Sequence, residues 1–177
     1  MRRTLDLLYD AAGYLAAFFI FAIFAVMVGS SVLRELGFKT GGTDDVVSWM
    51  CAAAAFLAMA HAFKHGDFVR VVLLLERLGP GKRRVLELAC LSIATLFLAA
   101  LAWAAARFVY DSWQFKDMPS GLIALPLWIP QSSFVLGAAL LFLAALDELV
   151  TVLRGRKPAY VLAVEERHAR GDFTEDL

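Results

Sequence analysis

Long apolar segments alternate with shorter polar connections along this chain. Four of these segments contain no Asp, Glu, Lys or Arg, and they cover residues 11–33, 46–63, 88–106 and 129–146. Crossing the hydrocarbon core of a bilayer takes about 20 predominantly apolar residues in a helix, so each segment is about long enough. The pattern predicts an all-α integral membrane protein. We expect a four-helix transmembrane domain over residues 1–158.

Composition agrees with this prediction. Sixty per cent of the residues are hydrophobic and the mean hydropathy is +0.68, whereas soluble domains hold about 45–50% apolar residues. The net charge is zero, so bulk charge indicates no nucleic-acid partner. Residues 159–177 are polar and of mixed charge, and we expect them to form a cytoplasmic tail without an activity of its own.

The distribution of basic residues predicts the orientation. Thirteen of the 17 Lys and Arg residues lie in the two tails and the second connection, and four lie in the first and third connections. Basic residues favour the cytoplasmic side, so both termini should be cytoplasmic. The four tryptophans gather on the opposite side, as expected for an aromatic belt at the outer interface, and they are Trp49, Trp103, Trp113 and Trp128.

The second connection contains a further apolar segment that is too short to span. Residues 68–78 read FVRVVLLLERL, and Gly79-Pro80-Gly81 breaks the chain after them. We expect a short helix in the cytoplasmic interface, with Arg70 and Arg77 at the lipid headgroups. Two roles remain open: an arm that braces a partner, or a linker that dips into the headgroups.

Small residues and prolines indicate how the spans begin and pack. The second, third and fourth spans are rich in Ala and Gly, including Ala54 and Ala58, which allow helix backbones to approach closely in lipid. Pro126 and Pro130 predict an extended entry to the fourth span, with Trp128 at the headgroups. Pro130 suits the first turn of that helix, where a missing N–H is tolerated.

Asp44 and Asp45 are the first candidates for a functional site. Two adjacent carboxylates can bind a cation, but they also suit the first turn of a helix, where acids are stabilised. We favour the helix-terminal role, with Thr43 or Asp44 as the N-cap.

His61 and His65 are the second candidates, because residues four apart share a helix face. The sequence shows no third ligand beside them, so we expect interfacial histidines and neither metal nor haem. The two cysteines form no CxxC motif, which argues against a zinc or dithiol site. No nucleophile–base pair or phosphate-binding loop is evident. We therefore predict no catalytic residue, no cofactor and no enzyme.

Three sequence features together resemble one known family. They are Asp44-Asp45 ahead of Trp49, the segment AHAFKHGDFVRVVLLLERL at 60–78, and SGLIALPLWIPQSSFVLGAALLFLAALDEL at 120–149. Their order along a four-span chain resembles the small membrane subunit of tripartite ATP-independent periplasmic (TRAP) transporters, the DctQ-like family. Within it, the basic–Gly–x–x–x–Arg–Val pattern is matched by Lys64, Gly66, Arg70 and Val71. The Pro–x–Trp–x–Pro entry is matched by Pro126, Trp128 and Pro130.

The resemblance implies a function and a location. It implies a scaffold in the bacterial inner membrane that assembles with a large permease subunit and a periplasmic substrate-binding protein. Such a system uses a sodium gradient to take up an organic acid. The small-residue faces and the interfacial arm would then hold the large subunit. Two alternatives remain: an accessory subunit of a tripartite tricarboxylate transporter, or the membrane anchor of a redox complex.

Overall fold

The computed structural model describes residues 2–66, 80–155, 158, 161–162 and 169. These residues form long helices and no strand, and the four helices are α1 (Arg2–Glu35), α2 (Thr43–His65), α4 (Pro80–Phe115) and α5 (Trp128–Leu153). All four are long and apolar enough to cross a membrane. The predicted all-helical architecture with four spans is confirmed. The expected interfacial helix at 68–78, with Arg70 and Arg77, lies outside the described residues, as does most of the tail.

The helices extend well beyond the uncharged segments. Helix α4 has 36 residues, which corresponds to about 54 Å at 1.5 Å per residue, against a hydrocarbon core of about 30 Å. It begins at Pro80, a residue suited to the first helical position. It then continues through Arg107 and Asp111 to Phe115. The third connection is therefore shorter than the charge pattern predicted, because those two residues belong to the helix.

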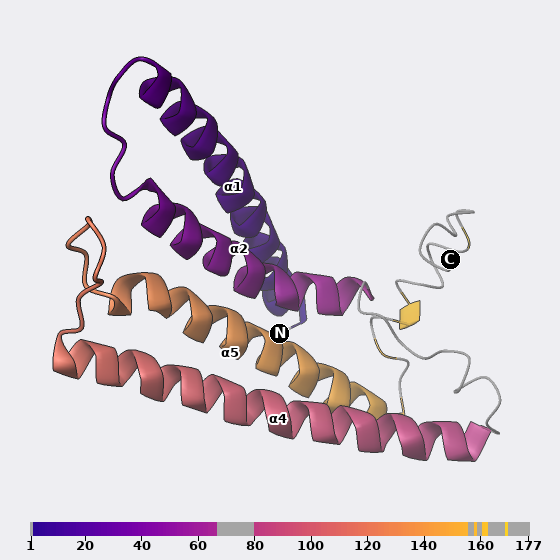
Figure 1. The fold of residues 1–177 in the computed structure, drawn as a ribbon. Helices are drawn as coiled ribbons and strands as arrows, with labels where there is room; N and C mark the ends of the chain where they lie inside the picture. The colour runs from indigo at the N-terminus through magenta and orange to yellow at the C-terminus, as the bar shows by residue number, and fades with distance from the viewer. Residues whose placement is uncertain (1, 67–79, 156–157, 159–160, 163–168, 170–177) are drawn as a thin grey trace.

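The helices pack in the order α1, α2, α5, α4. The main contacts are between α1 and α2, between α2 and α5, and between α5 and α4, so that α1 and α4 occupy the two edges (Figure 1). Burial follows this order: 44% of the most apolar window of α5 is buried, against 6% for α1 and 11% for α4. Both edge helices thus present apolar surface to their surroundings.

Small residues fill the contact between the two inner helices. A Cβ atom added at Gly137 of α5 would lie 2.5 Å from the carbonyl oxygen of Phe56 in α2. The rings of Phe56 and Phe134 lie close by, with centroids 4.9 Å apart. Hydrophobic burial does not drive helices together in lipid, so this close backbone approach supplies packing contacts instead.

The α1–α2 and α4–α5 connections lie at the same end of the molecule (Figure 1). At the loop end, the α4–α5 connection lies against the start of α2. A Cβ added at Gly41 would lie 2.7 Å from Leu122, and one at Gly42 would lie 2.6 Å from Ile123. Gly42 also has a φ of 82°, which favours glycine. The opposite end holds the start of α1 and the last turns of α2 and α5, and it carries the charged side chains described next.

Candidate functional site

The last turns of α2 carry three polar side chains that point to both neighbouring helices. Lys64 and His65 follow His61 by three and four residues, so both lie on the helix surface next to it. Because α2 packs between α1 and α5, this surface can contact both. Lys64 contacts α5 and His61 contacts α1, which divides the site into two groups.

The first group is a buried ion-pair cluster. The Nζ atom of Lys64 lies 2.8 Å from Oδ2 of Asp147 and 3.0 Å from Oε1 of Glu148, so it donates to carboxylates of two successive residues of α5. Glu148 is fully buried, and the side chain of Lys64 is only 9% exposed. Charges removed from water to this extent need a partner, and each charge here has one.

Tyr9 of α1 completes this cluster. Its ring is buried against Ala60 of α2 and Ala144 of α5, and Nζ of Lys64 lies 5.4 Å from the ring centroid. At that distance the ammonium group interacts favourably with the face of the ring. The Lys64 cluster, formed by Tyr9, Lys64, Asp147 and Glu148, therefore joins three helices at one point.

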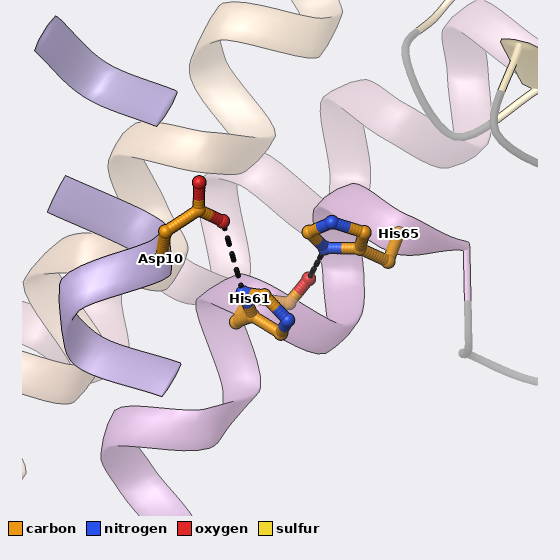
Figure 2. A group of neighbouring side chains, drawn as sticks. All are labelled: Asp10, His61 and His65. Carbon is orange, nitrogen blue, oxygen red and sulfur yellow. Dashed lines mark hydrogen bonds and ion pairs between the residues drawn. The ribbon is translucent and has the colours of Figure 1, made fainter. Parts of the chain in front are cut away.

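The second group joins α1 to α2 (Figure 2). Nδ1 of His61 lies 3.3 Å from Oδ1 of Asp10, and Nδ1 of His65 lies 2.9 Å from the carbonyl oxygen of His61. The two imidazole rings are close together, with centroids 4.0 Å apart. One potential ligand atom from each of Asp10, His61 and His65 lies within 4.8 Å of the others. The sequence did not show a third potential ligand beside the histidine pair, and the structure places Asp10 of another helix there.

The structure places the acidic pair in the first turn of α2 as expected, but without side-chain capping. The N-cap is Gly42, and no side chain makes a cap hydrogen bond. The hydroxyl of Thr43 donates to the carbonyl oxygen of Thr40 instead. The prediction of Thr43 or Asp44 as the cap is wrong, because the left-handed glycine already turns the chain into the helix. The carboxylate of Asp45 packs directly against Gly121 of the α4–α5 connection.

The other predicted site residues lie either in the contacts between helices or near the starts of α2 and α5. Ala54 is buried inside this chain, and Ala58 packs against the buried group Ala12, Ala16 and Leu57. Both alanines thus support contacts among the chain's own helices. Pro130 lies in the first turn of α5, as predicted, and Trp128 begins that helix with 38% of its surface exposed. Trp49 lies in the second turn of α2, and Pro126 precedes α5.

Sequence reasoning missed the Lys64 cluster because its charges fall just beyond the uncharged segments. Lys64 directly follows the segment 46–63, and Asp147 directly follows 129–146. A signal was present: in a chain whose successive spans alternate in direction, the second and fourth spans run parallel, which brings these opposite charges to the same end. Asp10 directly precedes the segment 11–33, so antiparallel first and second spans likewise bring it to the end that carries His61.

A comparison with protein families gives an independent result. Residues 23–155 match the family described as "Tripartite ATP-independent periplasmic transporters, DctQ component". No curated protein matches the chain by sequence. The matched region covers three quarters of the chain and includes α2, α4, α5 and the C-terminal part of α1, residues 23–35. Together with the four apolar helices, this match shows that the chain belongs to the DctQ family, as a small membrane subunit of a TRAP transporter.

Proposed function

We propose that this chain is the scaffold subunit of a sodium-driven transporter for an organic acid. It would assemble with a large permease subunit and a periplasmic binding protein in the bacterial inner membrane. The match of residues 23–155 to the DctQ family is the observation that carries this proposal. The substrate contacts would lie on the other two proteins.

The placement of charge supports a scaffold more than a carrier. Ionisable residues that line a transport pathway usually face the interior of the membrane domain. Here the middle of each apolar segment has none. The buried charges near the ends of α2 and α5 pair with one another across helices. Such pairing favours a fixed arrangement of helices over a site that binds and releases an ion.

The proposed topology has both termini in the cytoplasm. Its support is the thirteen-to-four distribution of basic residues described above. The end that carries the Lys64 cluster would then face the cytoplasm, and the connection between α4 and α5 would face the periplasm. In this orientation the connection would lie on the same side of the membrane as the periplasmic binding protein.

The apolar surfaces of the edge helices are our candidates for the contact with the large subunit. On α1, Phe18, Phe21 and Phe24 are each more than 60% exposed. On α4, Leu96 and Phe97 are exposed to a similar extent. Lipid and the large subunit would share these two surfaces. Since Ala54 is buried inside this chain, we do not expect it to contact the large subunit directly.

Reconstitution into liposomes tests the function. The chain alone, under an inward sodium gradient, should take up no organic acid. The chain with its large subunit and binding protein should give sodium-dependent uptake, and omission of this chain should abolish it. Uptake by this chain alone, or full uptake by the other two components without it, would contradict the scaffold role.

A further inference from the structure

Two histidines and one carboxylate meet at the end of α2 that carries the Lys64 cluster. Asp10 comes from α1, and His61 and His65 come from successive turns of α2 (Figure 2). Their potential ligand atoms lie within 4.8 Å of one another. The side chains of Asp10 and His61 are 45% and 37% exposed, and His65 is exposed as well, so a small ion can reach them from solvent.

The two imidazole rings are held in defined orientations. Nδ1 of His65 lies 2.9 Å from the carbonyl oxygen of His61. A proton on Nδ1 would donate to that oxygen and leave the lone pair on Nε2, the tautomer that metal-binding histidines adopt when a carbonyl group fixes the ring. The ring of His61 lies directly against Gly13 of α1, where an added Cβ would be 2.8 Å from Cγ of the histidine. Any larger residue at position 13 would displace this ring.

A simple ion pair does not account for the whole arrangement. Nδ1 of His61 is buried, yet its 3.3 Å contact with Asp10 lacks the geometry of a hydrogen bond, which leaves the nitrogen without a hydrogen-bond partner among the described residues. Buried polar atoms are normally satisfied. The ring of His65 lies beside that of His61, with the two centroids 4.0 Å apart, so the two imidazoles converge on one position. A cation bound between the carboxylate and the two rings would give this buried nitrogen a partner.

The lysine between the two histidines in sequence does not compete for this position. Lys64 lies between the two histidines in sequence, but its ammonium group is directed to Asp147 and Glu148 of α5. The carboxylate of Asp10 therefore contacts His61 and not Lys64. The His–Asp group is in this way separate from the Lys64 cluster, although both lie at the same end of the molecule.

We propose that Asp10, His61 and His65 bind a late first-row divalent cation, with Zn²⁺ as the expected ion. Two imidazoles and one carboxylate suit Zn²⁺, whereas Mg²⁺ and Ca²⁺ prefer oxygen ligands. Zn–N and Zn–O bonds of about 2.0–2.2 Å bring tetrahedral ligands to within about 3.3–3.6 Å of one another. The three side chains would therefore close inward from their present separation. The bound ion would join α1 to α2.

Metal titration of the purified full-length chain tests the site. The protein carries an affinity tag without histidine and is first freed of metal with a chelator. Co²⁺ is added as a spectroscopic probe, and Zn²⁺ binding is measured by calorimetry. We expect one Zn²⁺ per chain, and visible Co²⁺ absorption bands that Zn²⁺ displaces. The absence of saturable binding by the wild-type chain would overturn the proposal.

Matched variants assign the ligands. Asp10→Asn, His61→Ala and His65→Ala should each weaken Zn²⁺ binding by at least about tenfold, the smaller loss expected even for residues that only support a ligand. Two controls should leave the affinity unchanged: Asp6→Asn, an exposed carboxylate one turn earlier on α1, and His168→Ala, the remaining histidine of the chain. Unchanged binding in the three ligand variants, or an equal loss in the controls, would place the metal elsewhere.

Thermal unfolding supplies a second measurement for variants that fold poorly. Zn²⁺ should raise the Tm of the wild-type chain, because a ligand that binds the folded state stabilises it, and a chelator should reverse the increase. Gly13→Val, which crowds His61 without removing a ligand, should also reduce the increase. An equal increase in Tm for wild-type protein and all four variants would contradict the site. None of these measurements involves transport, so they stand apart from the test of the proposed function.

Discussion

The ammonium group of Lys64 lies 3.0 Å from the carboxylate of Glu148, which is wholly buried between the helices. Both residues lie near the C-terminal ends of their helices, Lys64 in α2 and Glu148 in α5, so the contact joins positions 84 residues apart. A membrane helix gains little from burying apolar side chains against another helix, because lipid solvates them equally well. Paired charges at a helix end therefore provide specificity that apolar contacts in lipid lack.

Removal of the cation from this pair should be strongly destabilising. Lys64→Met leaves Glu148 buried without its cation, and breaking a buried pair in this way costs about 3–5 kcal/mol. We expect a lower Tm in detergent, measured by tryptophan fluorescence. The triple variant Lys64→Met, Asp147→Asn, Glu148→Gln should recover much of the loss, since no uncompensated charge remains. Lys116→Met, an exposed lysine in the α4–α5 connection, is the control and should leave the Tm unchanged.

Adjacent alanines of α2 should respond differently to enlargement. Ala54 is buried inside the chain and Ala55 is exposed. Ala54→Leu should overpack the α2 contacts and cost about 1–3 kcal/mol of stability. Ala55→Leu should leave the isolated subunit as stable as before. Equal losses in the two variants, measured as the Tm of the purified chain, would show that burial at these positions is not as described.

The same pair of variants reports on assembly. If Ala55 lies on the surface that contacts the large subunit, Ala55→Leu reduces co-purification of that subunit while the Tm of the isolated chain is unchanged. If Ala55 faces lipid, co-purification is unaffected. Ala54→Leu should reduce co-purification only together with stability.

Two mid-helix glycines provide a test of the α2–α5 contact. At Gly137 an added Cβ would meet the backbone of Phe56, whereas at Gly29 of α1 nothing lies within 4 Å. Gly137→Ala should force α2 and α5 apart and cost about 1–3 kcal/mol. Gly29→Ala should be neutral or slightly stabilising, because alanine is the better helix former by about 1 kcal/mol. The difference in Tm between the two variants measures the packing effect, and a Gly137→Ala protein as stable as Gly29→Ala would argue against close approach of these helices.

Reporter fusions test the orientation. A reporter that is active only in the periplasm should be inactive when fused after Leu177 and active when inserted at Met118, in the α4–α5 connection. A reporter that is active only in the cytoplasm should give the opposite result at both positions. Periplasmic activity of the C-terminal fusion would reverse the assignment of the Lys64 cluster to the cytoplasmic side.

Hydropathy and segment length by themselves determined that this chain is a four-span membrane protein, because both are local properties of the sequence. The order of motifs such as Asp44-Asp45, Lys64-His65-Gly66 and Pro126–Pro130 was enough to indicate the family. These features do not depend on which helices are neighbours. The positions of Pro130 and of the acidic pair in first helical turns could also be read locally, whereas the cap at Gly42 depended on a left-handed backbone conformation.

The tertiary structure alone decided which helices touch. In a membrane protein, lipid-facing and buried surfaces are both apolar, so hydrophobic periodicity does not distinguish the exposed face of α1 from the buried face of α5. For this reason the order α1, α2, α5, α4 and the burial of Ala54 were not evident from the sequence. The meeting of Asp10 with His61 and His65 depends on the same choice of neighbours. It exists because α1 packs on α2 with Gly13 opposite the imidazole of His61.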